Sequence, residues 1–491
     1  MTPVKRLLLL LLPVIALLGC SSAHVEWTSY EDLAGKRIGM LTSRGVDSAV
    51  RESFPGCQIL FYEDLPGLSL ALEKQQIDAF VCMREGSDMM LERHPHFRIL
   101  PGPGIPDSSA VGFRPDDILL AGEFNAFLSG IRADGTYDRM MENWFGAHPL
   151  REPYEAHGGE GKPFRVGIEV GQTFLTFAEG HEEAGLEPEL MARFAAWLGR
   201  PVQFVEMTGS GLIPSLLSGK VDAIVSGISP TPERRKRMLL SDVYESSPLV
   251  PVVLRADVPL PHQTWWKRLG TMLYDNIIAQ KRYLMILDGL FVTLLVTLAS
   301  IFFGGTLGAA LCWVKRRRSR QEARWVETYC TVIESIPIVV LLLFMFYVVF
   351  AATTLTATVV AIITFSLHFA ASACACLDES IGTVDKGQWE AGLSLGFTRF
   401  QTFRYVILPQ ATPRFLSLLK GSAIGLIEST SIVGFIALKD MTKVTDIIRS
   451  QTYDSLIPLT IVAVLYFLIA RLISVGLDRL ACRYTYNPEN R

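Results

Sequence analysis

Long apolar stretches dominate the second half of the chain. Residues 289–314 and 335–377 contain no charged side chain, and 421–438 and 456–477 are interrupted only by Glu428 and Arg471. About 20 apolar residues suffice for a helix to cross a bilayer. The second stretch is long enough for two helices, divided near residues 351–354. The pattern therefore predicts five membrane-spanning helices.

The first half has a different pattern. Residues 24–260 alternate short β-rich runs, such as 37–41, 58–62 and 164–169, with amphipathic stretches. Strand–helix–strand alternation on this spacing predicts α/β lobes with mostly parallel sheets. A polar, glycine-rich stretch at 156–162 divides the region in two. The fold class we expect is a multidomain chain: an α/β bilobal clamp followed by an all-α domain of five transmembrane helices.

Charged residues predict the side of the membrane on which each part lies. Lys5 and Arg6 precede the apolar run 7–19, which has the length of a signal peptide and not of a membrane span. Residues 24–260 should then be exported. The loop after the first span, 315–320, is rich in arginine and should be cytoplasmic. Residues 378–414 follow as cytoplasmic, 439–454 as outside and the C-terminus as inside.

The formal net charge of −3 conceals two opposite halves. Residues 24–260 hold 34 acidic and 22 basic side chains, whereas 261–491 hold 15 and 22. No basic surplus of the kind that nucleic-acid binders carry is present overall, so we expect no nucleic-acid partner. Eight cysteines are too few for a disulfide framework. A bridge between Cys57 and Cys82, which lie on two predicted strands, stays open.

Segment 163–258 contains an ordered series of motifs. They are Phe-Arg-Val-Gly at 164–167, Gly-Leu-Glu-Pro-Glu-Leu at 185–190, Gly-Lys-Val-Asp-Ala at 219–223 and Ser-Gly-Ile-Ser-Pro-Thr-Pro-Glu-Arg at 226–234. The series resembles the first lobe of periplasmic binding proteins for polar amino acids. Segment 24–148 resembles the second lobe, through 33–39, 77–79 and 134–137. Since the lobes stand in reversed order, we expect a permuted clamp that closes on its ligand by hinge motion.

This resemblance implies a set of ligand-binding residues. Arg234 would bind a carboxylate through its guanidinium fork, unless it only joins Arg235 and its neighbours as a solvated basic helix start. The other candidates are Gly227, Ser229, Ser226, Thr231, Phe174, Ser43 and Arg44.

Three positions depart from that family. Ser43-Arg44-Gly45 replaces Gly-Thr-Thr, Met83 stands where an aspartate pairs with the α-ammonium group, and Gly209 replaces an aromatic platform. An ammonium group buried without a carboxylate is costly. We therefore expect a ligand with an anionic end and no conventional ammonium contact, the alternative being a worn or merely regulatory site.

The predicted cytoplasmic loop contains the sharpest motif. Residues 387–396 read Gly-Gln-Trp-Glu-Ala-Gly-Leu-Ser-Leu-Gly, and Leu408-Pro409 follows. The run resembles the EAA loop of ABC importer permeases, with Gly392 in place of the second alanine. The resemblance implies a short helix, a turn at the glycine and a second helix that fits a groove on an ATPase. Its expected coupling residues are Glu390, Ala391, Gly396, Leu408 and Pro409; the alternative is an amphipathic loop on the membrane surface.

Residues 285–480 as a whole resemble polar-amino-acid permeases. An acidic side chain within a span is expensive and by default functional or partnered. We therefore assign Glu428, with Ser429 and Thr430, to the translocation path. The alternatives are a pair between Glu428 and Arg471 or a protonated Glu428 against helix backbone. At the N-terminus, the sequence around Cys20 resembles a lipobox and predicts lipidation, unless this segment is an uncleaved signal anchor.

Together these features predict a subunit of an ABC importer and not an enzyme. It would take up a polar amino acid or a similar small carboxylate-bearing solute across the bacterial cytoplasmic membrane. No phosphate-binding glycine-rich loop followed by Lys-Ser/Thr is found, so ATP would be used by a separate ATPase subunit, and we expect this chain to bind no cofactor or metal. Five helices make half of a two-fold pore, which implies a homodimer. The alternative is a ligand-gated channel or solute sensor built on the same lobes.

The predicted domain boundaries follow from these assignments. They are a signal peptide at 1–23, a second-lobe-like domain at 24–148, a linker at 149–162, a first-lobe-like domain at 163–258, an interfacial linker at 259–285 and the permease domain at 286–485.

Overall fold

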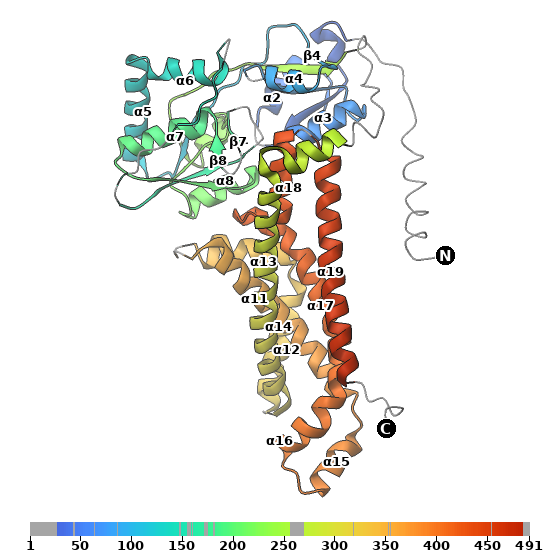
Figure 1. Ribbon diagram of the computed structural model, residues 1–491. Coiled ribbons are helices and arrows are strands. Elements are labelled where there is room, and N and C mark those ends of the chain that lie inside the picture. The colour runs from blue at the N-terminus through green and yellow to red at the C-terminus, as the bar shows by residue number, and fades with distance from the viewer. Residues whose placement is uncertain are drawn as a thin grey trace.

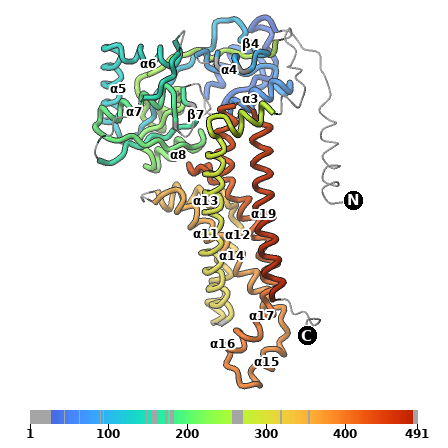
Figure 2. The backbone as a smooth tube through the Cα atoms, in the orientation of Figure 1, coloured from blue at the N-terminus to red at the C-terminus, as the bar shows by residue number. Residues whose placement is uncertain are grey.

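The computed structural model consists of two α/β lobes that sit on one end of a column of helices (Figures 1 and 2). It describes residues 27–42, 45–62, 64–85, 87–146, 149–154, 159, 161–170, 175–179, 182–255, 270–317, 319–351, 353, 355–452 and 454–484. The predicted signal segment and the lipidation site at Cys20 lie outside the described residues. Helices α15 and α16 lie at the end of the column opposite the lobes (Figure 1).

The lobe that contains the N-terminal strands is named the β1 lobe here. Its sheet has the strand order β2-β1-β3-β12-β4. Its elements are η1 (Tyr30–Leu33), β1 (Arg37–Leu41), α2 (Asp47–Ser53), β2 (Gln58–Tyr62), α3 (Leu65–Glu73), β3 (Ala79–Met83), α4 (Ser87–Arg93), β4 (Phe97–Ile99) and β12 (Leu249–Leu254). β1, β2 and β3 run parallel, whereas β12 runs antiparallel to both of its neighbours.

The second lobe, the β6 lobe, is built on a sheet of order β11-β5-β10-β6-β9. Its elements are β5 (Gly112–Phe113), α5 (Ile118–Ala133), α6 (Thr136–Phe145), β6 (Phe164–Ile168), β7 (Phe177–Glu179), β8 (Glu182–Ala184), α7 (Leu186–Trp197), β9 (Val202–Glu206), α8 (Gly209–Leu217), β10 (Ala223–Ile224), α9 (Pro232–Arg235) and β11 (Leu239–Leu240). β6, β9 and β10 are parallel, and β7 and β8 form a separate hairpin.

Sheet membership corrects the predicted division of the lobes at residues 149–162. β5 lies in the predicted first segment but pairs with β10 and β11 of the β6 lobe, while β12, from the predicted second segment, pairs with β3 and β4. The chain therefore crosses between the lobes twice, once between β4 and β5 and once between β11 and β12. A hydrophobic pattern identifies a strand but not its partner, so this exchange was not visible in the sequence.

The two lobes contain the same kind of arginine–aspartate ion pair. In the β1 lobe, the Arg37 guanidinium pairs with Asp78 at 2.8 Å and also donates to the carbonyl of Gln75. In the β6 lobe, Arg165 pairs with Asp222 at 2.9 Å and donates to the carbonyl of Gly219. In each case an arginine on a parallel strand, β1 or β6, fixes the turn before a neighbouring strand. The repeat supports the reading of both units as related lobes.

Cys57 and Cys82 do not form the bridge that the sequence left open. Both are buried free thiols in the β1 lobe. They act as small apolar residues in its core.

Within its described residues, the helical part contains four helices long and apolar enough to span a membrane, and a fifth span if one bent pair is counted as one. Its elements are η2 (Tyr274–Ile278), η3 (Ala279–Lys281), α11 (Arg282–Arg317), α12 (Arg320–Ser335), α13 (Ile338–Phe344), η4 (Met345–Val349), α14 (Ala357–Gly382), α15 (Lys386–Ser394), α16 (Arg399–Thr402), η5 (Phe403–Ile407), α17 (Leu408–Ser429), η6 (Thr430–Ile436), α18 (Met441–Thr452) and α19 (Leu456–Tyr484).

The bent pair corrects the predicted second span, which was expected to begin near residue 335. The break lies there instead: α12 ends at Ser335 and the chain turns by 100° into α13. Ile336 is extended, with ψ 123°, before Pro337. A proline disfavours helical geometry in the residue before it and cannot donate a backbone hydrogen bond. Apolar composition predicted the span but not this interruption.

Candidate functional site

The predicted ligand-binding residues of the β6 lobe come together on the loop after β10. The hydroxyl of Thr231 caps α9 by accepting from the backbone N–H of Arg234. Arg234 donates through Nη1 to the carbonyl of Ser229 at 3.1 Å. This loop continues from the carboxyl end of a strand in a parallel arrangement, where α/β sheets usually bind ligands.

Two of these polar groups have partners inside the chain, whereas the buried Ser226 hydroxyl has no hydrogen-bond partner among the described residues. The Gly227 N–H donates to Oε1 of Glu187 at 2.6 Å, and the Ser229 hydroxyl donates to Oδ1 of Asp107 at 2.8 Å. Ser226 is buried in the same loop. A ligand that used Gly227 or Ser229 would have to exchange with these carboxylates.

Arg234 faces the other lobe. A Cβ atom added to Gly45, which follows β1 in the β1 lobe, would lie 3.4 Å from Nη2 of Arg234. Gly45 has φ +68°, in the left-handed region that favours glycine. The guanidinium therefore lies between the lobes. The candidates Ser43, Arg44 and Phe174 lie outside the described residues, so their roles stay predictions.

The structure gives a physical reason for Gly209, which the sequence marked as a departure. Its N–H donates to Oε1 of Glu169, and a Cβ there would lie 2.6 Å from Oε2 of the same carboxylate. Glu169 follows β6 directly, is buried, and fills the space in which an aromatic side chain would begin. Glu169 was not predicted from the sequence. The signal that could have identified it is an acidic side chain directly after a buried strand. Met83 is buried in β3, as its strand position requires.

Buried ion pairs join the β6 lobe to the helical part. Nζ of Lys443, on α18, lies 3.3 Å from Oε1 of Glu206, and Nζ of Lys439 lies 3.2 Å from Oε2. The side chains of Glu206 and Lys443 are only 2 % and 10 % exposed. Burial alone would lower the pKa of Lys443, but the charges of Glu206 and Glu169 raise it above its ordinary value. Lys443 is therefore held as a buried ammonium group.

The β1 lobe contacts the same helix. Nη2 of Arg449, near the end of α18, lies 3.2 Å from Oδ2 of Asp64. Asp64 also caps α3, because its side chain accepts from the N–H of Gly67 at 2.7 Å. One helix thus carries ionic contacts to both lobes. The sequence suggested nothing of this junction beyond the basic residues in its predicted outside loop.

A second set of contacts joins the β6 lobe to the same end of the helical column. Nζ of Lys220 donates to the carbonyl of Phe350 at 2.6 Å. The hydroxyls of Ser215 and Tyr347 lie 3.3 Å apart. Tyr347 and Phe350 lie at the end of the predicted second span, next to the turn near 351–354 that is predicted to be outside, and α18 lies in the predicted outside segment 439–454. The lobes and the predicted cytoplasmic loop lie at opposite ends of the column, as the charge-based topology requires, and the side of the membrane that each faces stays a prediction (Figure 1).

That loop has the helix–turn–helix form that its motif implies. α15 ends beside Gly396, which has φ +82°, and α16 begins three residues later. Pro409 lies at the start of α17, directly after the π-helical turn η5. Glu390 and Ala391 are exposed on α15.

The side chain of Thr402 explains why the structure has glycine at position 392, where the motif has alanine. A Cβ at Gly392 would lie 2.4 Å from Cγ2 of Thr402, which packs α15 against α16. The loop also exposes apolar side chains, including Leu395 at 76 % and Phe400 at 60 %. A cluster of exposed large apolar residues outside the spans marks an interaction surface.

The predicted translocation residues lie where α17 gives way to η6. The hydroxyls of Ser429 and Thr430 donate back to the carbonyls of Gly425 and Ile427 in their own helix. Glu428 is exposed on the surface of the single chain. Arg471 is exposed as well, and the described part of the chain has no ion pair between the two.

Comparison with known proteins bears on the helical part. Residues 300–483 match the family described as binding-protein-dependent transport system inner membrane component. The L-cystine transport system permease protein TcyB of Bacillus subtilis is 32 % identical over 210 residues, which are 42 % of this chain and 89 % of that protein. The glutamate/aspartate import permease protein GltK of Escherichia coli is 28 % identical over 206 residues, 40 % of this chain and 91 % of that protein.

Two solved structures are similar at low TM-scores. An amino acid ABC transporter crystallised with histidines has 26 % identity and a TM-score of 0.39, and the match covers 46 % of this chain and all of that one. The extracellular-binding protein ytmK of a Bacillus subtilis amino-acid ABC transporter has 13 % identity and a TM-score of 0.26, with 49 % and 92 % covered.

The apolar helices agree with the family match and with the two permease relatives. The chain belongs to the family of inner-membrane permease components of binding-protein-dependent transport systems, as an amino-acid-type ABC permease whose helices follow two α/β lobes.

Proposed function

We propose that this chain is both the receptor and the permease of an ABC importer. It captures a polar amino acid or a similar small carboxylate-bearing solute outside and passes it to a path between permease domains. The observation that supports the proposal is the buried junction between Glu206 and Lys443, which joins the β6 lobe to α18 at one end of the helical column. A tethered receptor acts at a local concentration of order millimolar.

The solute class follows from the groups between the lobes. Arg234 provides a cationic fork for a carboxylate. Glu169, at the carboxyl end of β6, provides an anionic group at the same edge of the sheet. Such an arrangement suits a solute with a carboxylate and, at some distance from it, a cationic or hydrogen-bond-donating group. The names of the relatives, which specify cystine or glutamate and aspartate, fit this class.

Energy would come from a separate ATPase bound to the α15–α16 loop. Leu395 and Phe400 supply exposed apolar anchors there. Glu390 is exposed on α15. A helix with exposed apolar anchors typically binds in a hydrophobic groove of its partner. ATP binding and hydrolysis would then move α17 through the rigid turn at Gly396.

A second copy of the chain would complete the pore. Glu334 and Glu428 are acidic residues of membrane helices, and both are exposed on the single chain. An acidic group facing lipid is expensive. A two-fold dimer that turns these residues toward a shared aqueous path removes that cost.

Purification of the full chain from its native membrane tests the proposal. We expect an ABC ATPase to co-purify and its ATP hydrolysis to rise with one solute of a panel of amino acids and small carboxylates. The double variant Leu395→Asp/Phe400→Asp should lose the ATPase while it still binds the solute. Ligand-evoked ion current from the chain without an ATPase would overturn the proposal in favour of a channel.

A further inference from the structure

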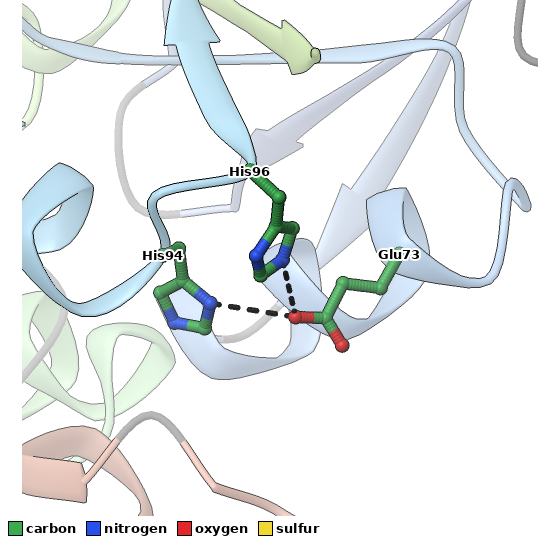
Figure 3. Close-up of side chains that lie close together, drawn as sticks. All are labelled: Glu73, His94 and His96. Atoms are coloured by element: carbon green, nitrogen blue, oxygen red, sulfur yellow. Dashed lines mark hydrogen bonds and ion pairs between the residues drawn. The ribbon is translucent and has the colours of Figure 1, made fainter. Parts of the chain in front are cut away.

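Three side chains of the β1 lobe converge outside the ligand-binding region. Glu73 ends α3, and His94 and His96 lie in the turn between α4 and β4 (Figure 3). Oε1 of Glu73 lies 2.9 Å from Nε2 of His96 and 3.3 Å from Nδ1 of His94. Their candidate ligand atoms all lie within 4.8 Å of one another.

This cluster lies at the edge of the lobe opposite the cleft. β4 runs parallel to β1 and β3, because both β4 and β3 are antiparallel to β12. His96 directly precedes β4 and therefore marks the amino end of these strands. Gly45 and the cleft lie at their carboxyl end. The cluster is thus a separate site and not part of the solute-binding surface.

Burial and packing hold both imidazoles in place. His94 is 9 % exposed and His96 is 6 % exposed. The Phe97 ring stacks on His94 at 4.8 Å and meets His96 edge-on at 4.6 Å. Ligands fixed in this way lose little freedom when an ion binds.

The donor set and its spacing suit a borderline divalent cation. Two imidazoles with one carboxylate are a common zinc ligand set. Tetrahedral bonds of about 2.0–2.1 Å place ligand atoms about 3.3–3.4 Å apart. The two measured separations, 2.9 and 3.3 Å, lie close to that value. Small side-chain movements would therefore admit an ion, with water in its fourth position.

We propose that Glu73, His94 and His96 form a structural site for a divalent transition-metal ion, of which Zn²⁺ fits best. The ion would fasten the end of α3 to the start of β4. The beginning of α3 is the segment whose cap, Asp64, pairs with Arg449 of the permease. Metal binding would thus stiffen the helix through which the β1 lobe contacts α18.

Titration of the tag-free, chelator-treated full chain with ZnCl₂ in detergent tests this site. We expect one tightly bound ion per chain by calorimetry, and with CoCl₂ the visible absorption of a tetrahedral site. Loss of a direct ligand should weaken binding by more than the 10–100-fold that loss of an outer-shell partner costs. Glu73→Gln and His96→Ala should both show this loss.

Two controls keep the result interpretable. Glu92→Gln removes a carboxylate from an exposed position of the neighbouring α4 and should bind zinc as the parent does. Glu73→Gln preserves side-chain size, so its parent-like unfolding temperature without metal would show an intact lobe. Zinc should raise the unfolding temperature of the parent chain and not that of Glu73→Gln. Absence of binding, or equal binding by parent and Glu73→Gln, would overturn the proposal and leave a hydrogen-bonded triad. Neither outcome depends on transport.

Discussion

Lys443 of the permease and Glu206 of the β6 lobe form a buried ion pair, with Nζ 3.3 Å from Oε1. Glu206 is the last residue of β9, and Lys443 lies in the first turn of α18. Arg449, further along the same helix, pairs with Asp64 of the β1 lobe. Any change in the angle between the lobes must therefore strain or release contacts on one helix. We expect α18 to transmit clamp closure to the membrane helices.

Replacement of Lys443 by methionine, which has a similar length, tests this junction. The change leaves Glu206 buried with only Lys439, and breaking a buried pair costs up to about 3–5 kcal/mol. We expect both a lower unfolding temperature of the full chain and at least a tenfold loss of solute-stimulated ATP hydrolysis. Glu206→Gln should cause the same two losses, in unfolding temperature and in solute-stimulated ATP hydrolysis.

The double variant Lys443→Met/Glu206→Gln separates pairing from packing. It should recover part of the stability, because residue 206 no longer carries a buried charge that has lost its partner. Lys439→Met is the control; this side chain is 44 % exposed, so its pair contributes little. Additive losses in the double variant would show that the two groups do not interact.

Arg234 should determine solute binding. Truncation to alanine removes the charge-assisted bonds to a carboxylate, and we expect at least about 2 kcal/mol, or roughly 30-fold, weaker binding by calorimetry. Arg235→Ala, an exposed neighbour on α9, is the matched control and should bind as the parent does. Equal effects of the two substitutions would mean that Arg234 is only part of a solvated basic segment.

Gly392 and Thr402 should show a compensating pair of substitutions. Gly392→Ala places a methyl group 2.4 Å from Cγ2 of Thr402 and should separate α15 from α16, which lowers co-purification of the ATPase. Addition of Thr402→Ala removes Cγ2 and should restore most of it. Thr402→Ala alone measures the loss of the hydrogen bond to the Thr398 carbonyl. Failure of the double variant to recover would contradict a steric origin.

Asp222 should govern the acid stability of the β6 lobe. Burial alone would raise its pKa, but hydrogen bonds and charge from Arg165, with Arg114, hold the pKa below its ordinary value of 3.8. A carboxyl with a lowered pKa stabilises the fold above its unfolded pKa, and this contribution is lost as pH falls below it. Asp222→Asn should therefore lower the free energy of unfolding at pH 7 by about 3 kcal/mol. Between pH 5 and 3, the variant should lose less of its remaining stability than the parent chain does.

Thermal unfolding at several pH values measures this difference. Asp242→Asn, at an exposed position of the same lobe, should follow the parent chain throughout. A parallel acid response of the parent and Asp222→Asn would show that Asp222 does not contribute.

Local patterns in the sequence predicted the α/β units, the apolar helices and the helix–turn–helix form of the loop at 386–402, because each rests on spacing within one segment. Apolar length predicted five spans, but the break at Pro337 depends on backbone geometry that composition does not report. The exchange of β5 and β12 between sheets depends on pairing across more than a hundred residues.

The candidate site was harder to predict for the same reason. The Glu169 carboxylate leaves no room for a side chain at position 209. This steric limit arises only because the end of β6 and the start of α8 meet in space. Lys443 and Glu206 are 237 positions apart and belong to different domains. Their sequence neighbourhoods contain no motif, so only the structure reveals the junction.

Uptake into liposomes tests the central claim most directly. The full chain, reconstituted with the ATPase that co-purifies with it, is given labelled solute outside and ATP inside, with no soluble binding protein. We predict ATP-dependent accumulation that Lys443→Met reduces at least tenfold. Accumulation that appears only after a soluble binding protein is added would contradict the account, because the attached lobes would then not be the receptor.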